Sequence, residues 1–239
     1  MINKYNILFI DIETVSKEKS YEDLSETFKA LWQNKHAQLI KDDSQTPAES
    51  YEDRAAIYAE FGKIVCISCG YIAKENQKDS FRIKSFFGEN EKTLLQNFAA
   101  MLQTNYSDIQ SQTLCGHNIK EFDIPYLCRR MLINGIKLPE IININGKKPW
   151  EVNFIDTLQL WKFGDYKAYT SLNLLAALFD IPTPKDDIDG SMVGKVFWQE
   201  NDLDRIKTYC QKDVITVLRL YQKMQGEAYL EDEHVVVIS

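Results

Sequence analysis

The sequence contains no long apolar run, and this absence argues against a membrane-spanning helix. Its longest apolar stretches, at residues 7–10 and 64–69, are far shorter than the roughly 18 residues that a spanning helix needs. Residues 1–5 lead directly into a strand-like run and lack the layout of a secretory signal. We therefore expect a cytoplasmic protein that has no membrane partner.

The sequence also lacks the high cysteine content of a disulfide-stabilised scaffold. The five cysteines are an odd number in a chain of 239 residues, as is typical of reduced thiols. Cys66 and Cys69 form a C-x-x-C pair, a spacing that can indicate zinc or redox chemistry. Here the pair lies in a strand-like run, where residues three apart point to opposite faces. Buried thiols are therefore favoured over a zinc or redox site.

Positive charge is in deficit, with 28 Lys and Arg against 35 Asp and Glu and a net charge of −7. This sign argues against tight binding of nucleic acid through a broad basic face. A nuclease that binds divalent cations between carboxylates can nevertheless carry acidic charge, because the metals present positive charge to the phosphate. The negative net charge is therefore compatible with a metal-dependent nuclease.

Apolar periodicity predicts one α/β domain over residues 1–225, followed by a tail at 226–239 to which no role is assigned. Short apolar or alternating runs predict strands at residues 5–10, 62–73, 81–86, 113–116 and 150–155. Three- and four-residue apolar spacing predicts helices at residues 89–102, 122–133, 171–179, 192–199 and 203–225. The polar segment at about 16–60 is interpreted as an insertion with helical patches. This order predicts a mixed five-stranded sheet, an antiparallel meander plus parallel strands, flanked by helices.

Two carboxylates, Asp11 and Glu13, follow the first predicted strand. Side chains two apart on a strand share a face, so both acids should project together, which is costly unless a cation lies between them. Taken alone, the D-x-E pattern is common, and two solvated acids at a strand exit explain it better. The pair becomes informative only together with other acids.

A second motif runs from a predicted strand into a predicted helix at residues 116–123. Asn118 is suited to tie down the turn backbone, and Phe122 can pack inward. Asp123 stands near the helix start, where a carboxylate is electrostatically favoured. That position also allows a plainer interpretation, in which Asp123 is only a favourable first-turn acid.

A third motif lies in the last long helix, where Tyr209 and Asp213 are four residues apart and so share one face. Apolar neighbours such as Ile206 and Ile215 indicate that this side of the helix meets the sheet. An acid on such a face is hard to explain as solvated surface. The three motifs in this order are far more specific than any one of them.

The motifs D-x-E-T, N-x-x-x-F-D and Y-x-x-x-D resemble the three exonuclease motifs of the DEDD superfamily, in its tyrosine-containing (DEDDy) branch. More narrowly, the chain resembles stand-alone bacterial exonucleases related to the proofreading exonuclease domain of family B DNA polymerases. In the histidine-containing branch of the superfamily, a histidine five residues before the last Asp takes the place of the tyrosine. That position is Thr208 here, so the motif is assigned to the tyrosine-containing branch. Supporting stretches lie at residues 54–67, 178–185 and 189–191, and the likeness spans about residues 7–220.

The resemblance implies an RNase H-like fold and a 3′–5′ exonuclease that acts on single-stranded or frayed DNA by a two-metal-ion mechanism. It implies that two divalent ions, Mg²⁺ or Mn²⁺, are bound by Asp11, Glu13, Asp123 and Asp213. It also implies that Tyr209 orients the attacking water. Oxygen ligands fit these metals better than zinc. The residues expected to contact the substrate are Thr14, Asn118, Phe122 and Lys185.

Several alternatives stay open at the level of sequence. The catalytic groups do not read the sugar, so a 3′–5′ exoribonuclease fits equally well, and the fold could instead serve as a non-catalytic binding module in a repair or replication complex. Lys185 follows a Pro-rich turn and could be a solvated lysine. Asp156 ends the fifth predicted strand, and a structural role behind the metal site is favoured for it. His117 could simply satisfy backbone groups. No protein partner is indicated.

Overall fold

The computed structural model describes residues 2–41, 44–75, 77–165, 167, 169–182 and 188–238. Within them lies a mixed six-stranded sheet of order β5-β4-β1-β2-β3-β6. Its strands are β1 (Ile7–Ser16), β2 (Gly62–Glu75), β3 (Lys78–Phe87), β4 (Thr113–Gly116), β5 (Ile155–Asp156) and β6 (Val235–Val237). The first three form an antiparallel meander, and the other three each pair in parallel with a neighbour. The predicted α/β class and meander are confirmed.

The sheet has one strand more than the five that the sequence predicted, because the tail supplies β6. Val235 pairs with Phe81, so β6 extends the edge of β3. The approach to this edge is fixed by α8, where the buried Arg219 donates to the Leu230 carbonyl oxygen at 3.0 Å and to Asp232 Oδ1 at 2.6 Å. A charged side chain on the last helix therefore directs the tail back onto the sheet.

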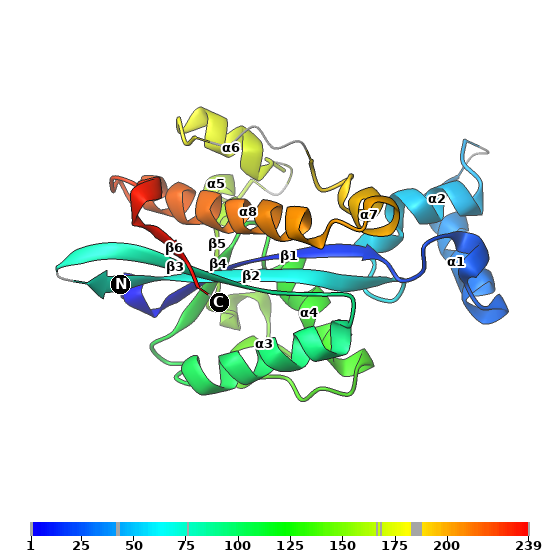
Figure 1. The fold of residues 1–239 in the computed structure, drawn as a ribbon, viewed down its shortest axis with the longest axis horizontal. Coiled ribbons are helices and arrows are strands. Elements are labelled where there is room, and N and C mark those ends of the chain that lie inside the picture. Colours follow the sequence, from blue (N-terminus) through cyan, green and yellow to red (C-terminus); the bar gives the residue numbers. More distant parts are fainter. Residues whose placement is uncertain are drawn as a thin grey trace.

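Helices cover both faces of the sheet (Figure 1). They are α1 (Glu26–Leu39), α2 (Pro47–Arg54), α3 (Glu91–Asn105), α4 (Asp123–Ile133), α5 (Thr157–Lys162), α6 (Leu172–Leu178), α7 (Val193–Lys195) and α8 (Leu203–Met224). α3 and α4 pack on one face and α8 runs along the other, whereas α1 and α2 lie beyond the end of β1 (Figure 1). No helix among the described residues has both the length and the apolarity to cross a bilayer.

Strand β1 separates the two layers of the core because its side chains alternate between faces. Leu8 and Ile10 join the cluster formed with α3 and α4. Ile7 and Phe9 join the cluster formed with α8. Odd-numbered side chains at the start of β1 therefore point towards α8.

Two predicted elements are shorter or different in kind. The fifth strand was predicted at residues 150–155, but β5 is only Ile155–Asp156, because Pro149–Glu151 forms a 3₁₀ turn beginning at a proline. The helix predicted at residues 192–199 is α7 followed by a wider π-helical turn at Val196–Glu200.

The insertion between β1 and β2 has a small aromatic core of its own. Trp32 and Tyr51 are fully buried there and meet edge to face with ring centroids 5.3 Å apart. Phe61 packs on Trp32 at 4.9 Å, and Trp32 Nε1 donates to the Pro47 carbonyl oxygen at 2.8 Å. The segment predicted as a polar insertion is therefore a folded α1–α2 unit.

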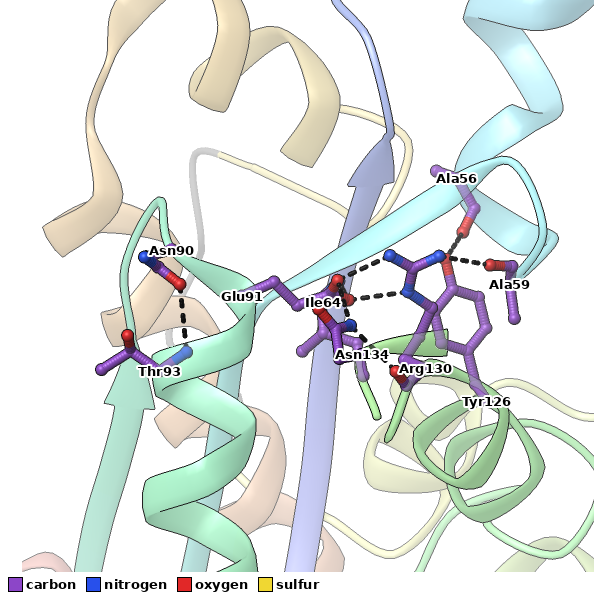
Figure 2. Close-up of polar contacts among 9 residues, drawn as sticks. All are labelled: Ala56, Ala59, Ile64, Asn90, Glu91, Thr93, Tyr126, Arg130 and Asn134. Carbon is purple, nitrogen blue, oxygen red and sulfur yellow. Dashed lines mark hydrogen bonds and ion pairs between the residues drawn. The ribbon is translucent and has the colours of Figure 1, made fainter. Parts of the chain in front are cut away.

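A buried polar network anchors this unit to the domain (Figure 2). Arg130 on α4 donates to both carboxylate oxygens of Glu91 at 2.8 and 2.6 Å, and to the Ala59 carbonyl oxygen at 2.8 Å. The Tyr126 hydroxyl donates to the Ala56 carbonyl oxygen at 2.9 Å. Side chains of α4 thus satisfy backbone groups at the end of the insertion, and Glu91 of α3 holds the Arg130 guanidinium.

The cysteines are free thiols, as the sequence predicted. Cys66 packs in a cluster with α8, whereas Cys69 packs in the cluster with α3 and α4. The two side chains of the C-x-x-C pair therefore point to opposite faces of β2. They do not form a zinc or redox pair.

Candidate active site

The first two predicted acids project from β1 towards α8. Asp11 and Glu13 share a face with Phe9, whose ring packs in the α8 cluster. The pairing of β1 with β2 shifts after Glu13, which pairs with Cys66, whereas Thr14 pairs with Ile64. Such irregularities often re-aim side chains beside active sites. Glu13 is only 7% exposed, although it is a carboxylate.

The third acid, Asp123, is the first residue of α4 and is 4% exposed. Burial raises the pKa of its carboxyl to about 7, and the charge of Asp156 adds to this rise. Hydrogen bonds from the backbone N–H groups of Ile12 and of Asp123 itself act in the opposite direction. The bond from Ile12 places this carboxylate directly beside the Asp11–Glu13 segment of β1.

The fourth acid comes from α8, together with Tyr209. The Tyr209 hydroxyl forms a hydrogen bond to Asp213, and burial followed by the charges of Asp213, Glu13 and Asp11 raises the pKa of Tyr209 well above its ordinary range. Tyr209 therefore stays protonated and acts as a donor. The helical stripe that includes Ile206 and Val214 fixes this face of α8 against the sheet.

The four acids lie close enough to repel one another. The pKa of Asp11 lies well above its ordinary value because of burial and then because of the charges of Asp213 and Asp123. The pKa of Glu13 is raised in the same way by burial and by Asp11. Across the described residues, no Lys, Arg or His forms an ion pair with Asp11, Glu13 or Asp123. Carboxylate oxygens gathered in this way fit hard divalent metals such as Mg²⁺ and Mn²⁺.

A thiol that sequence reasoning missed also lies in this cluster. Cys210 Sγ is 3.4 Å from Asp11 Oδ2 and 3.5 Å from the Asp11 carbonyl oxygen. One donor atom each from Asp11, Glu13 and Cys210 lie within 4.8 Å of one another. Its position in the sequence could have predicted this location. Cys210 directly follows Tyr209 and lies four residues after Ile206, on the buried stripe of α8.

Asp156 organises the turn that leads to Asp123. Its carboxylate accepts hydrogen bonds from the backbone N–H groups of Asn118 at 3.0 Å and Lys120 at 3.1 Å. It also caps α5 by accepting from Leu158 at 3.0 Å and Gln159 at 3.3 Å. The sequence had favoured the Asn118 side chain for tying down this turn, whereas the carboxylate of Asp156 does so from the neighbouring strand.

His117, next to this turn, has a hydrogen-bond partner at each of its two ring nitrogens. Its Nδ1 lies 2.9 Å from Thr157 Oγ1, and its Nε2 lies 2.9 Å from the Thr170 carbonyl oxygen. Burial lowers the pKa of His117. A neutral imidazole between two fixed partners has a structural role, as the sequence had allowed.

Three of the four predicted substrate contacts lie near the acids. Thr14 follows Glu13, and its hydroxyl donates to the Ala56 carbonyl oxygen at 2.9 Å. Asn118 has a positive φ of 61° in the turn before α4. Phe122 immediately precedes Asp123, and its ring packs on Tyr126. Lys185 lies outside the described residues.

Comparison with known proteins gives a family and a fold. A family model described as "Predicted 3'-5' exonuclease related to the exonuclease domain of PolB" matches residues 57–234. Asp123, Tyr209 and Asp213 lie within the matched region, whereas Asp11 and Glu13 precede it. No curated protein matches the sequence.

The fold is similar to that of part of a family B DNA polymerase from the hyperthermophilic archaeon Pyrobaculum calidifontis. The TM-score is 0.58 at 16% sequence identity, and the match covers 92% of this chain and 24% of the polymerase. The chain therefore spans about a quarter of the length of that protein. At this identity the likeness shows the fold, which is consistent with the predicted RNase H-like architecture.

Proposed function

Because the chain belongs to the family of predicted 3′–5′ exonucleases related to the exonuclease domain of PolB, we propose that it is a metal-dependent exonuclease that shortens single-stranded or frayed DNA from the 3′ end. Family membership agrees with the resemblance drawn from the three motifs. The observation that carries the proposal is the convergence of four carboxylates from β1, α4 and α8, where burial and then the charges of the neighbouring acids raise the pKa of Asp11 and Glu13.

We propose that two divalent ions, Mg²⁺ or Mn²⁺, are held by Asp11, Glu13, Asp123 and Asp213. Such ions, when bound, supply a hydroxide nucleophile near neutral pH and stabilise charge on the leaving oxygen. The carboxylates contribute oxygen donors in a buried setting, where their attraction for a cation is strong. Bound cations would also relieve the repulsion among the acids.

Tyr209 is proposed to orient the attacking water. Its phenol is protonated and is already directed at Asp213, so it can donate or accept a hydrogen bond at the position where a water meets that carboxylate. Asp156 supports the site by fixing the turn before Asp123. Contacts of Thr14 and Phe122 with the terminal nucleotide stay predictions, as do those of Asn118 and Lys185.

The decisive experiment is cleavage of matched single-stranded DNA and RNA, labelled at the 5′ end, with Mg²⁺ or Mn²⁺. We expect stepwise shortening of the DNA from its 3′ end. Asp11→Ala should remove activity, whereas Asp108→Ala, which changes an exposed acid in a loop, should keep it. Intact substrate in both metals, or unchanged cleavage by Asp11→Ala, would refute the proposal. Preferential shortening of the RNA would identify an exoribonuclease.

A second measurement separates the enzyme from a binding module that has the same fold. Titration calorimetry with Mn²⁺ should saturate at two ions per chain if the four acids form a two-metal site. A module that only binds nucleic acid does not need this occupancy. Saturation at two ions per chain would therefore argue against a protein that only binds nucleic acid.

A further inference from the structure

The thiol of Cys210 is a soft donor that lies against the hard oxygen donors of the acid cluster. Cys210 Sγ lies 3.4 Å from Asp11 Oδ2, where the thiol donates a weak hydrogen bond to the carboxylate. The sulfur and one carboxylate oxygen each from Asp11 and Glu13 all lie within 4.8 Å of one another. These three donors come from β1 and α8, so the packing of the helix on the strand fixes their separation.

Glu13 independently indicates a cationic ligand at this position. It is 7% exposed, and no side chain or backbone group among the described residues donates a hydrogen bond to its carboxylate or pairs with it. A buried carboxylate normally has such a partner because desolvation of its charge is costly. Its oxygen instead faces Asp11 Oδ and the Cys210 sulfur.

The donor set decides which cations fit. Oxygen-only sites suit Mg²⁺ and Mn²⁺, whereas a thiolate selects softer ions such as Zn²⁺ and its analogue Cd²⁺. A tetrahedral zinc-type site needs three protein ligands and can keep a fourth position for water. Asp11, Glu13 and Cys210 supply that number.

We propose that Asp11, Glu13 and Cys210 form a mixed oxygen–sulfur site that captures a thiophilic divalent cation of the Zn²⁺ class. On binding, the Cys210 S–H bond breaks, its electron pair forms the sulfur–metal bond, and the proton passes to solvent. The ion shares Asp11 and Glu13 with Mg²⁺ and so displaces it. Inhibition as a consequence rests on the proposed exonuclease function, whereas binding does not.

Cadmium alone tests the site, because a cadmium–thiolate bond gives an ultraviolet charge-transfer absorption that needs no turnover. Wild-type protein titrated with Cd²⁺ should develop this absorption and saturate at one ion per chain. Cys210→Ser should abolish it. Cys66→Ser and Cys128→Ser change other thiols, of which Cys66 is buried beside Cys210 and Cys128 is partly exposed, and both should retain it.

Two further titrations place the ion without removing the thiol. Glu13→Gln should weaken Cd²⁺ binding at least about tenfold, a loss of the size that even indirect supporting groups cause. Excess Mg²⁺ should raise the Cd²⁺ concentration for half-saturation in the wild type. Absence of the absorption in the wild type, its survival in Cys210→Ser, or unchanged Cd²⁺ affinity in Glu13→Gln would overturn the proposal. Indifference to Mg²⁺ would count against Mg²⁺ binding by Asp11 and Glu13, which belongs to the proposed function.

The outcomes for the two proposals are separable. Charge-transfer absorption in a protein that leaves nucleic acid intact supports the thiolate site and counts against the exonuclease. Mg²⁺-dependent cleavage without the absorption refutes the thiolate site alone. If both hold, Zn²⁺ should inhibit the wild type in the presence of Mg²⁺, and added chelator should reverse the inhibition.

Discussion

Replacing Asp123 by Asn should stabilise the metal-free protein, by an amount that grows with pH. Asp123 is 4% exposed, and burial is the main cause that raises the pKa of its carboxyl from 3.8 to about 7. Since one pKa unit corresponds to about 1.4 kcal/mol, ionising this carboxyl in the folded protein costs on the order of 4 kcal/mol more than in the unfolded chain. The Asn side chain carries no such cost.

The sign of the pH dependence follows from which state holds the proton more tightly. The folded pKa is raised, so the stabilising effect of protonation is complete below pH 3.8 and is lost as the pH rises to about 7. Between about pH 5 and about pH 8, the wild type should lose about 3 kcal/mol that the variant keeps. The variant gives up an attraction to the α4 dipole, worth up to about 1 kcal/mol, so it stays more stable at the higher pH.

Urea unfolding followed by circular dichroism, with chelator present, measures the free energy of unfolding of both proteins at the two pH values. Asp108→Asn is the matched control, because hydrogen bonds from Ser111 and Gln110 lower the pKa of Asp108. The stabilising effect of the ionised Asp108 carboxylate is complete above pH 3.8 and is lost only below it, so the difference between wild type and this variant should be the same at both pH values. A difference between wild type and Asp123→Asn that is equal at both pH values, or a variant less stable at pH near 8, would refute the reasoning. Added Mg²⁺ should stabilise the wild type more than the variant.

Three other changes test the site and its support. Tyr209→Phe should lower kcat about 100-fold, because the donor hydroxyl is lost while the ring stays packed; steady-state cleavage of labelled DNA measures this, and an unchanged kcat would contradict the role of Tyr209. Arg130→Met should cost about 3–5 kcal/mol of stability in urea unfolding, because it leaves the buried Glu91 charge without its guanidinium. Combining it with Glu91→Leu should recover most of that loss, and no recovery would argue against the ion pair as the cause. Asp156→Ala should lower the free energy of unfolding by about 3 kcal/mol, because four backbone N–H groups lose a charged acceptor. It should also weaken Mn²⁺ binding in calorimetry. Unchanged Mn²⁺ affinity would show that Asp156 does not position Asp123.

The parts of the fold that the sequence predicted are those with a clear local period. The strands β1, β2 and β3 carry long apolar or alternating runs, and α8 carries a continuous buried stripe that includes Ile206 and Val214. Strand alternation correctly placed Asp11 and Glu13 on one face, and it also separated Cys66 from Cys69. Local spacing was enough in these cases because each element buries one regular face.

The parts that were missed depend on contacts between distant segments. A run of three valines in β6 is too short to predict a strand by itself, and it becomes one only because Arg219 holds the preceding segment. The insertion is mostly polar in sequence, so its composition did not predict the buried contact between Trp32 and Tyr51. Cys210 has no chemical motif of its own, and its nearness to Asp11 follows from how α8 docks on β1.

The wide separation of the four carboxylates along the chain has a consequence during protein synthesis. Asp123 and Asp213 are 90 positions apart, which a ribosome traverses in roughly 5–20 s. A nascent chain whose α8 is still in the exit tunnel has no partner for the acids on β1 and α4. Under the proposed function, the growing polypeptide cannot attack nearby nucleic acid until that helix has emerged and docked.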